Sequence, residues 1–456
     1  MYVKEHHDKK IKAFSLSQEL SHLIISQTCL AYLVQFEAQE SVNYADFSLM
    51  NYAAKNWIFH AKSSNGDKCQ ESSLAELMTM LLTPKSLAFV NWVEIYDPQA
   101  ASEHLPPLYY ACKFGLIEVT LSLLKNGADV NARMNKNHGY VLQVASSEGH
   151  NTIAELLIDN GANVNAQGGH YGNALQAASY KGYEAIAKLL IENGVDVNAK
   201  GRYGNALQVA LDKGQETIAK LLIENGADVH AKGGHDGNAL QAASYKGYEA
   251  IVKILIENGA DVNAQAGHYG TALQAASFTG CEGIAKLLIE NGADVNAQGG
   301  HYGNALLTAV YCHHKAIGKL LIENGADVNV QGRYGNALQV ALYKGQEAIA
   351  KLLIENGADV HAQGGHYGNA LLTAVYCYQE ATAKFLIENG ADVNVKGRYG
   401  NALQVALYKG QEAIAKLLIE NGADVNARGH YGNALQAASL GGHEPIAKLL
   451  IESGLM

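Results

Sequence analysis

The sequence predicts an all-α fold, in which a solenoid of about eleven stacked helix pairs with β-hairpin-like linkers follows a small helical domain. Nearly identical segments return every 32 to 34 residues from residue 105 onward, and each carries two short stretches with helical periodicity. Two short helices cannot bury their shared apolar face alone, so such a unit is stable only when it stacks on copies of itself.

The first helix of the repeat is clearest in residues 172–203. Asn173 precedes the run ALQAAS, where its side chain can accept a hydrogen bond from an unpaired backbone N–H of the first turn. We expect the helix to reach Lys181 and to end at Gly182, because glycine adopts the left-handed conformation without a Cβ clash. The same cap position holds Asn205, Asn238, Thr271, Asn304, Asn336, Asn369, Asn401 and Asn433.

The second helix is expected to begin near Tyr183. It carries Ile186, Leu189 and Leu190 at i, i+3 and i+4, which makes one apolar stripe. A glycine closes it in every copy, and eleven such glycines define eleven units: Gly127, Gly161, Gly194, Gly226, Gly259, Gly292, Gly325, Gly357, Gly390, Gly422 and Gly454.

These residues resemble the ankyrin repeat. LLIENGADVNA is similar to the second helix and hairpin of that family, and NALQAA stands where the family usually has TPLHLAA. The resemblance covers residues 105–456 and implies an ankyrin-repeat α-solenoid. Asn-Ala in place of Thr-Pro keeps the N-cap but loses the rigid proline at the first helical position.

Residues 1–104 do not repeat, yet they show helical periodicity, and we expect a separate helical domain whose two tryptophans fill its core. SQTCLAYLVQF and FSLMNYAAKNWIFHA resemble the helical region that joins a NACHT nucleotide-binding module to C-terminal ankyrin repeats in fungal receptor-like proteins. The chain contains no GxxxxGK[ST] phosphate loop, so the nucleotide switch of such receptors is expected to be absent.

The net charge of −10 divides into −4 for residues 1–104 and −6 for residues 105–456, so neither part is basic, which argues against a nucleic-acid partner. Six scattered cysteines predict free, buried thiols in a reducing compartment. The first thirteen residues are charged, and no apolar run approaches the roughly 20 residues needed to cross a bilayer. We therefore expect a cytoplasmic protein without a membrane partner.

Tyrosine recurs at two positions of the repeat and supplies the candidate partner-binding residues. In the ankyrin family both positions lie towards the concave side, where partners usually dock, and tyrosine offers a large amphipathic contact area with few rotamers to freeze. The linker position, where Asp236 is the exception, holds Tyr171, Tyr203, Tyr269, Tyr302, Tyr334, Tyr367, Tyr399 and Tyr431. The position before the turn, where Phe278 and Asp212 are the exceptions, holds Tyr180, Tyr245, Tyr311, Tyr343, Tyr376 and Tyr408.

Each set is expected to stack as a ladder. The alternative to partner binding is that the rings only pack on one another and hold the linkers in register. Near identity among the copies indicates either a repetitive partner or recent homogenisation of the array.

A potential cation precedes the linker position in each of these repeats, including the one that holds Asp236: His170, Arg202, His235, His268, His301, Arg333, His366, Arg398 and His430. Stacked helix pairs lie about 8 to 10 Å apart, whereas zinc ligands must lie within about 2.1 Å of the metal. We therefore expect no metal site. In two repeats His313 and Tyr378 replace the turn glycine, which predicts left-handed strain of roughly 1 to 2 kcal/mol at each.

No Ser, His and Asp set and no carboxylate pair stands outside the repeat, so we expect no catalytic residue, no cofactor and no small-molecule substrate. The predicted function is a non-catalytic protein–protein interaction scaffold or sensor that binds partners on the concave ankyrin surface. The NACHT resemblance implies an alternative, a sensor or effector fragment of a nucleotide-driven receptor acting with a separate NTPase. A decayed fragment without function is a third interpretation.

Overall fold

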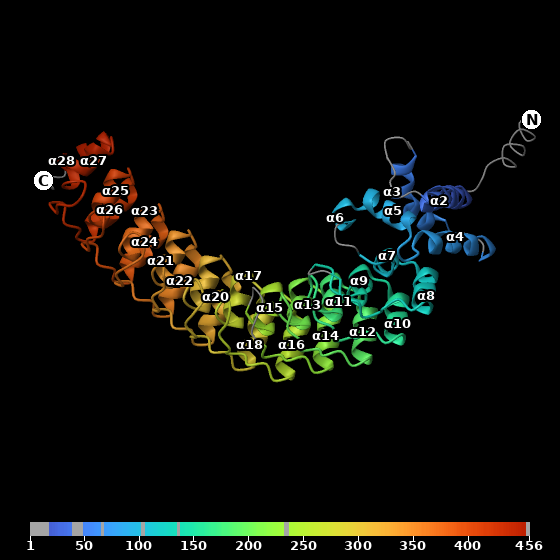
Figure 1. Ribbon diagram of the computed structural model, residues 1–456. Coiled ribbons are helices and arrows are strands. Elements are labelled where there is room, and N and C mark those ends of the chain that lie inside the picture. Colours follow the sequence, from blue (N-terminus) through green and yellow to red (C-terminus); the bar gives the residue numbers. More distant parts are fainter. Residues whose placement is uncertain are drawn as a thin grey trace, which may run out of the picture. The chain divides into compact units, whose positions relative to one another are not determined.

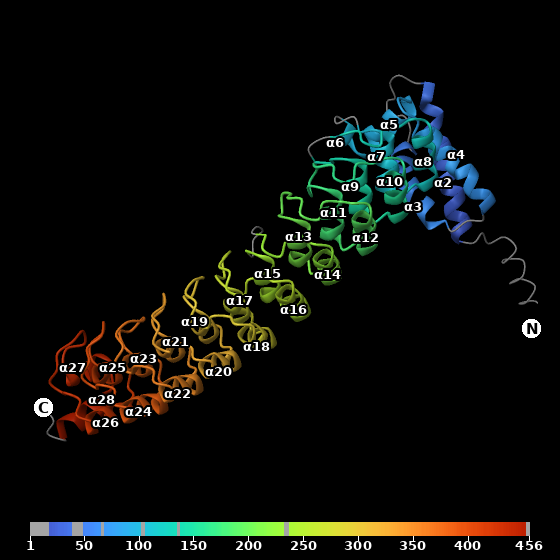
Figure 2. The same cartoon turned by 90° about the horizontal axis from the view of Figure 1, so that it is seen from below.

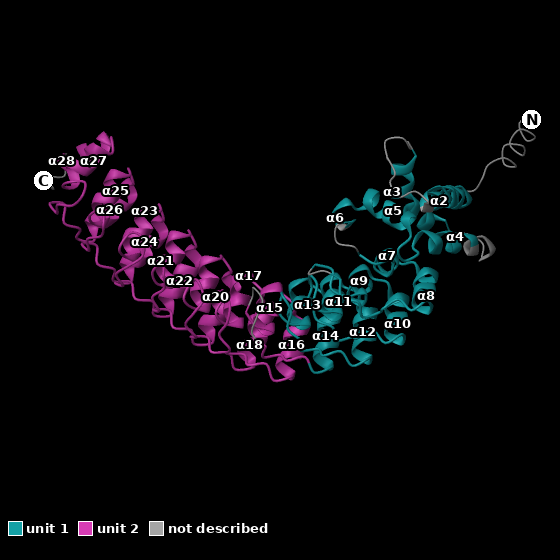
Figure 3. Ribbon diagram, viewed as in Figure 1, with its two compact units in different colours: residues 1–226 teal, residues 227–456 magenta. Residues whose placement is uncertain are grey.

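The computed structural model describes residues 18–38, 49–64, 68–101, 105–134, 137–231 and 237–452. The first thirteen residues, His235, Asp236 and Gly454, on which predictions were made, lie outside these ranges. The chain divides into two compact units, residues 1–226 and 227–456 (Figure 3). The predicted domain boundary at residue 105 lies inside unit 1 and stays a prediction.

Unit 1 begins with a group of helices that do not repeat. They are α2 Gln18–Val34, the 3-10 turn η1 Gln35–Ala38, α3 Met50–Ser63, α4 Lys68–Leu81, α5 Leu87–Tyr96 and α6 Pro98–Ala101. Trp57 of α3 and Trp92 of α5 are fully buried, which confirms that they fill the core. The indole of Trp92 donates to the carbonyl of Ala54 at 3.0 Å and packs on Tyr110 of the first repeat at 5.1 Å between ring centroids.

Helix pairs make up the rest of the described chain, four in unit 1 and seven in unit 2, which confirms the predicted number of repeats. In unit 1 they are α7 Pro107–Phe114 with α8 Ile117–Lys125, α9 Val141–Glu148 with α10 Asn151–Asp159, α11 Ala174–Lys181 with α12 Glu184–Glu192, and α13 Ala206–Asp212 with α14 Glu216–Glu224. In unit 2 they are α15 Ala239–Lys246 with α16 Glu249–Glu257, α17 Ala272–Thr279 with α18 Glu282–Glu290, α19 Ala305–Tyr311 with α20 Lys315–Glu323, α21 Ala337–Tyr343 with α22 Glu347–Glu355, α23 Ala370–Tyr376 with α24 Glu380–Glu388, α25 Ala402–Tyr408 with α26 Glu412–Glu420, and α27 Ala434–Leu440 with α28 Glu444–Glu452.

Within unit 2, first helices pack on first helices and second helices on second helices, so the two kinds form separate rows (Figures 1 and 2). The described linkers contain isolated antiparallel bridges rather than strands, for example between Gly299 and Gly303. In unit 1, Ile186, Ala187 and Leu190 of α12 are fully buried. Ile186 and Leu190 of the predicted stripe therefore belong to the core of the solenoid, whereas Leu189 is half-buried.

The caps follow the prediction. Asn173 Oδ1 accepts from the backbone N–H of Gln176 at 2.8 Å, and Gly182 has a φ of +85°. Gln176 makes three further hydrogen bonds that the prediction did not include. Its Oε1 accepts from the N–H of Asn173 at 3.0 Å, which completes a capping box, and its Nε2 donates to the carbonyls of Ala199 and Gly204 in the next linker at 2.9 and 2.8 Å.

A second chain of bonds joins successive hairpins. Asn296 Nδ2 donates to the carbonyl of Gly325 at 3.1 Å, and Asn296 Oδ1 accepts from the N–H of Asp327 at 2.7 Å, both in the following repeat. Asp294 Oδ1 accepts from the N–H of Asn296 at 2.9 Å. The Asp and Asn of the GADVN motif are thus structural.

The two substituted turns keep the glycine geometry. His313 and Tyr378 have φ values of +67° and +60°, in the left-handed region that glycine occupies in the other copies. The turn has not changed type, so the predicted strain remains in the fold.

Candidate functional site

Within each unit the tyrosines of the two sets pack on one another and form an aromatic band instead of two independent ladders. In unit 2 the ring of Tyr311 lies between two linker rings, with centroids 4.5 Å from Tyr302 and 5.0 Å from Tyr334. The linker rings themselves are 6.3 Å apart. Tyr376 lies in the same way between Tyr367 at 3.9 Å and Tyr399 at 5.7 Å. The separate ladders expected from the sequence are therefore wrong in detail, because Tyr311 and Tyr376 insert between neighbouring linker rings.

Of the remaining helix rings, Tyr180 also lies between two linker rings, whereas Tyr245, Tyr343 and Tyr408 pack on the linker tyrosine that follows each of them. In unit 1, Tyr180 lies 5.0 Å from Tyr171 and 5.9 Å from Tyr203. In unit 2 the further pairs are Tyr245 with Tyr269 at 4.4 Å, Tyr343 with Tyr367 at 6.3 Å and Tyr408 with Tyr431 at 4.1 Å.

Most band rings are half-buried, but Tyr343, Tyr334, Tyr408 and Tyr203 are 50%, 40%, 37% and 36% exposed. Burial raises the pKa of Tyr302 and Tyr431, and it raises the pKa of Tyr367 to about 12. These phenols stay protonated at neutral pH and remain hydrogen-bond donors. The rings both pack on one another and leave part of their surface open to solvent.

Lysines that were not predicted as site residues lie on helix rings of the band. Lys344 Nζ lies 3.9 Å from the ring centroid of Tyr311, and Lys409 Nζ lies 3.9 Å from that of Tyr376. These are cation–π contacts between successive repeats. The signal was present in the recurring YKG, where each lysine precedes the turn glycine. The cations that the sequence did single out lie farther away, with Arg333 at 5.8 Å from its own neighbour Tyr334.

Charge is segregated along each repeat of unit 2. Among its residues that the structure describes, the linkers and first helices contain no Asp or Glu, because the acidic residues stand on the second helices and at the hairpin tips. The same segments carry seven fixed cations: Lys246, Arg333, Lys344, Lys396, Arg398, Lys409 and Arg428. This face is thus cationic and aromatic in a chain whose net charge is −10.

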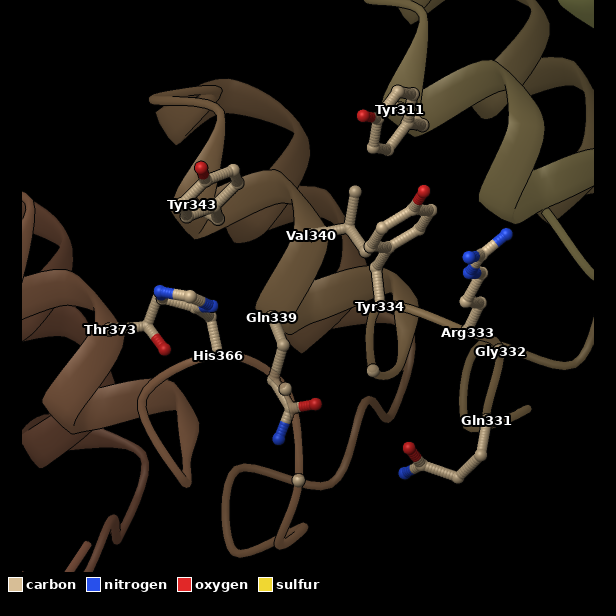
Figure 4. A pocket seen from close by; sticks show the side chains of 13 residues that line it. Tyr311, Gln331, Gly332, Arg333, Tyr334, Gln339, Val340, Tyr343, His366 and Thr373 are labelled. Carbon is tan, nitrogen blue, oxygen red and sulfur yellow. The ribbon is translucent and has the colours of Figure 1, made fainter. Parts of the chain in front are cut away.

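A groove of about 480 Å³ opens in this face. Tyr311 and Tyr334 lie on one side of Val340 at its floor, and Tyr343 and His366 lie on the other (Figure 4). A smaller hollow of about 180 Å³, lined by His268, Tyr269, Phe278, His301 and Tyr302 among others, lies in the same unit. Both hollows are lined by predicted site residues.

The histidines approach more closely than helix spacing predicts. The rings of His268 and His301 stack with centroids 5.6 Å apart, because the linker side chains lean together. In the part of the chain that the structure describes, no group of three or more His, Cys, Asp or Glu side chains is arranged to hold a metal ion. Searched over the same residues, the helices include none with the length and apolarity that a membrane crossing requires.

The cysteines are only partly as expected. Cys29 and Cys112 are buried free thiols, whereas Cys281, Cys312 and Cys377 are free but half-buried. Burial raises the pKa of Cys312 and Cys377, and the charges of Lys344 and Lys409 oppose this. The side chain of the sixth, Cys69, lies outside the described part of the structure.

Comparison with known proteins follows from this geometry. The family model described as ankyrin repeats in three copies matches residues 74–168, 142–233, 207–299, 298–364 and 371–456. The azaphilone pigments biosynthesis cluster protein L of Monascus ruber is 30% identical over 180 residues, and the match covers 34% of this chain and 37% of that protein. The crystal structure of the human ASB11 ankyrin repeat domain is 24% identical with a TM-score of 0.44, covering 49% of this chain and 99% of that one.

Proposed function

The chain belongs to the ankyrin-repeat family, a family of protein–protein interaction modules, and from this premise we propose that it is a non-catalytic scaffold or sensor that binds a protein partner on the face formed by its linkers and first helices. The observation that carries the proposal is the aromatic band of unit 2, where Tyr334, Tyr343 and Tyr408 keep more than a third of their surface exposed and where Tyr334 and Tyr343 line a groove. Exposed tyrosines with few rotamers are typical of the central contacts of an interface.

The proposed domain organisation is a helical segment of residues 1–104 and an array of residues 105–456. The contact of Trp92 with Tyr110 supports a capping role, in which α2–α6 cover the apolar face of the first repeat. The cysteine usage supports a cytoplasmic location. The alternative role with a separate NTPase depends on the resemblance of residues 26–61 alone.

Affinity capture from an extract of the source cells tests the proposal. The full chain is compared with Tyr343→Ala and Tyr408→Ala, which remove two rings of unit 2 that are 50% and 37% exposed on this face. The control is Lys319→Ala on α20, a side chain 59% exposed on the second-helix row. The two tyrosine variants should lose a defined set of partners that the control retains. Equal recovery by all four proteins would exclude this face as the docking surface.

A further inference from the structure

Unit 2 contains two equivalent clamps 65 residues apart. The first clamp consists of Tyr311, Arg333, Tyr334 and Lys344, and the second of Tyr376, Arg398, Tyr399 and Lys409. Lys409 also lies 4.8 Å from the ring centroid of Tyr378, at the position that His313 holds in the first clamp. In each clamp the lysine Nζ lies 3.9 Å from the helix ring, and in each the guanidinium carbon lies 5.8 Å from the linker ring. The helix and linker rings are 5.0 Å apart in the first clamp and 5.7 Å apart in the second.

A related arrangement in unit 1 already contains its own anion. Lys213 lies 4.5 Å from the ring of Tyr180, but Asp212 forms an ion pair with it at 3.0 Å. Asp212 occupies the position that Tyr343 and Tyr408 hold in unit 2. Over the described residues, neither Lys344 nor Lys409 has a carboxylate within ion-pair distance. The clamps of unit 2 therefore lack the internal counter-charge that the unit 1 arrangement has.

At the helix rings of the clamps, the covered faces of Tyr311 and Tyr376 favour carboxylates over stacked bases as the missing anion. Tyr311 and Tyr376 each have a lysine on the ring and a linker ring within 4.5 Å, so neither offers an open face for a base to stack on. A partner can still reach the charged groups of the clamp lysines and arginines and the exposed rings of Tyr334, Tyr343 and Tyr408. This surface complements acidic side chains on a peptide backbone.

The spacing of the clamps limits the spacing of the acids. The clamps are two repeats apart, and the first helices α19, α21, α23 and α25, which include the clamp residues Tyr311 and Tyr376, pack in sequence. Packed helices lie about 8 to 10 Å apart, which separates the clamps by about 16 to 20 Å. An extended peptide rises about 3.3 Å per residue, so acidic residues about five or six positions apart reach both clamps.

We propose that the two clamps bind one extended acidic segment of a partner protein, with acidic residues about five or six positions apart. This inference rests on the proposed function, since it names the chemistry of the partner on the same face. The fixed charge of the lysines supplies the attraction, and the rings hold each lysine in place. Engaging both clamps at once makes the second contact intramolecular, which raises affinity well above that of either contact alone.

The test uses fluorescence polarisation with the full chain and labelled 16-residue peptides. One peptide carries two Glu-Glu pairs whose first members are six positions apart, in a Gly-Ser-Tyr background. A second has the same composition with the pairs three positions apart, a third has Gln in place of Glu, and a 16-nucleotide oligothymidine is the fourth probe. The six-spaced peptide should bind at least about tenfold more tightly than the other three.

Variants separate the clamps from the rest of the face. Lys344→Gln and Lys409→Gln should each weaken the six-spaced peptide at least about tenfold, because one clamp is lost. Tyr343→Asp, which recreates the self-paired arrangement of unit 1, should have a similar effect. Lys319→Gln on α20 is the matched control and should bind normally. Thermal melts of each variant show that it is folded.

The inference is overturned if the two Glu spacings bind equally, if the oligothymidine binds as tightly as the six-spaced peptide, or if Lys319→Gln weakens binding as much as the clamp variants. Partner capture from extract distinguishes this failure from failure of the proposed function. If Tyr343→Ala loses partners that Lys344→Gln retains, the proposed docking face stands. The proposal that this face binds an acidic segment is then contradicted.

Discussion

Replacing Gln404 with alanine should open the linker of the following repeat. Gln404 is 2% exposed. Its Oε1 accepts from the N–H of Asn401 at 3.0 Å, and its Nε2 donates to the carbonyls of Ala427 and Gly432 at 2.7 and 2.6 Å. Each bond contributes about 1 kcal/mol net, so their loss lowers the free energy of local opening by about 3 kcal/mol, equivalent to roughly 100-fold in the opening equilibrium.

Native-state hydrogen exchange with mass spectrometry measures this directly. The reporter is the segment 423–434, where the N–H of Gly429 donates to the carbonyl of Gly432 at 3.0 Å. Exchange there should accelerate roughly 100-fold in Gln404→Ala, while the control Gln331→Ala, an exposed linker glutamine, should leave it unchanged. Unchanged exchange in Gln404→Ala would refute the view that this side chain ties one repeat to the next.

Three further predictions concern stability. His313→Gly should raise the free energy of unfolding in urea by about 1 kcal/mol, because it relieves a φ of +67°; Gly345→Ala, which introduces a Cβ at a φ of +72° with open space around it, should lower it by about 1 kcal/mol, and a gain in both variants would contradict the strain argument. The folded pKa of Tyr367, raised by burial to about 12, lies above the ordinary value of 10.0, so its contribution to stability should be fully present below about pH 10 and lost as pH rises through 12; the ultraviolet titration of wild type against Tyr367→Phe checks this, and a phenol that ionises near pH 10 in the folded chain would contradict it. Trp92→Ala should lower the free energy of unfolding by about 3 to 5 kcal/mol, since it empties a fully buried site; urea denaturation followed by the fluorescence of Trp57 measures it, and a loss below about 1 kcal/mol would show that the core does not depend on this ring.

The local features of the repeat were predictable because each depends on neighbours within one turn of chain. Asn173 caps a helix whose first residues follow it directly, and Gly182 adopts the left-handed conformation with no help from elsewhere. The strain at His313 follows from its own Cβ. Gln176 could also have been assigned as a capping-box residue from its spacing to Asn173, but its bonds to Ala199 and Gly204 could not, because those carbonyls belong to the next repeat.

The candidate site was only partly predictable, for the same reason. The tyrosines could be named by position, yet the insertion of Tyr311 between Tyr302 and Tyr334 depends on how far each linker leans over its neighbour. The contact of Lys344 with Tyr311 joins residues that are 33 positions apart in the sequence. Counting charges over residues 105–456 gave an acidic array and hid the cationic face, because a sum does not record which helix row carries each charge.

The sequence by itself therefore determined the repeat, its length, its two helices and the residues that begin and end them, since these follow from periodicity and from short-range backbone chemistry. Only the tertiary structure decided which side chains of successive repeats meet. It placed each clamp lysine on a tyrosine of the preceding repeat and Gln176 against the carbonyls of the next linker. These contacts depend on how one repeat is positioned on the next, and the sequence of a single repeat does not contain that information.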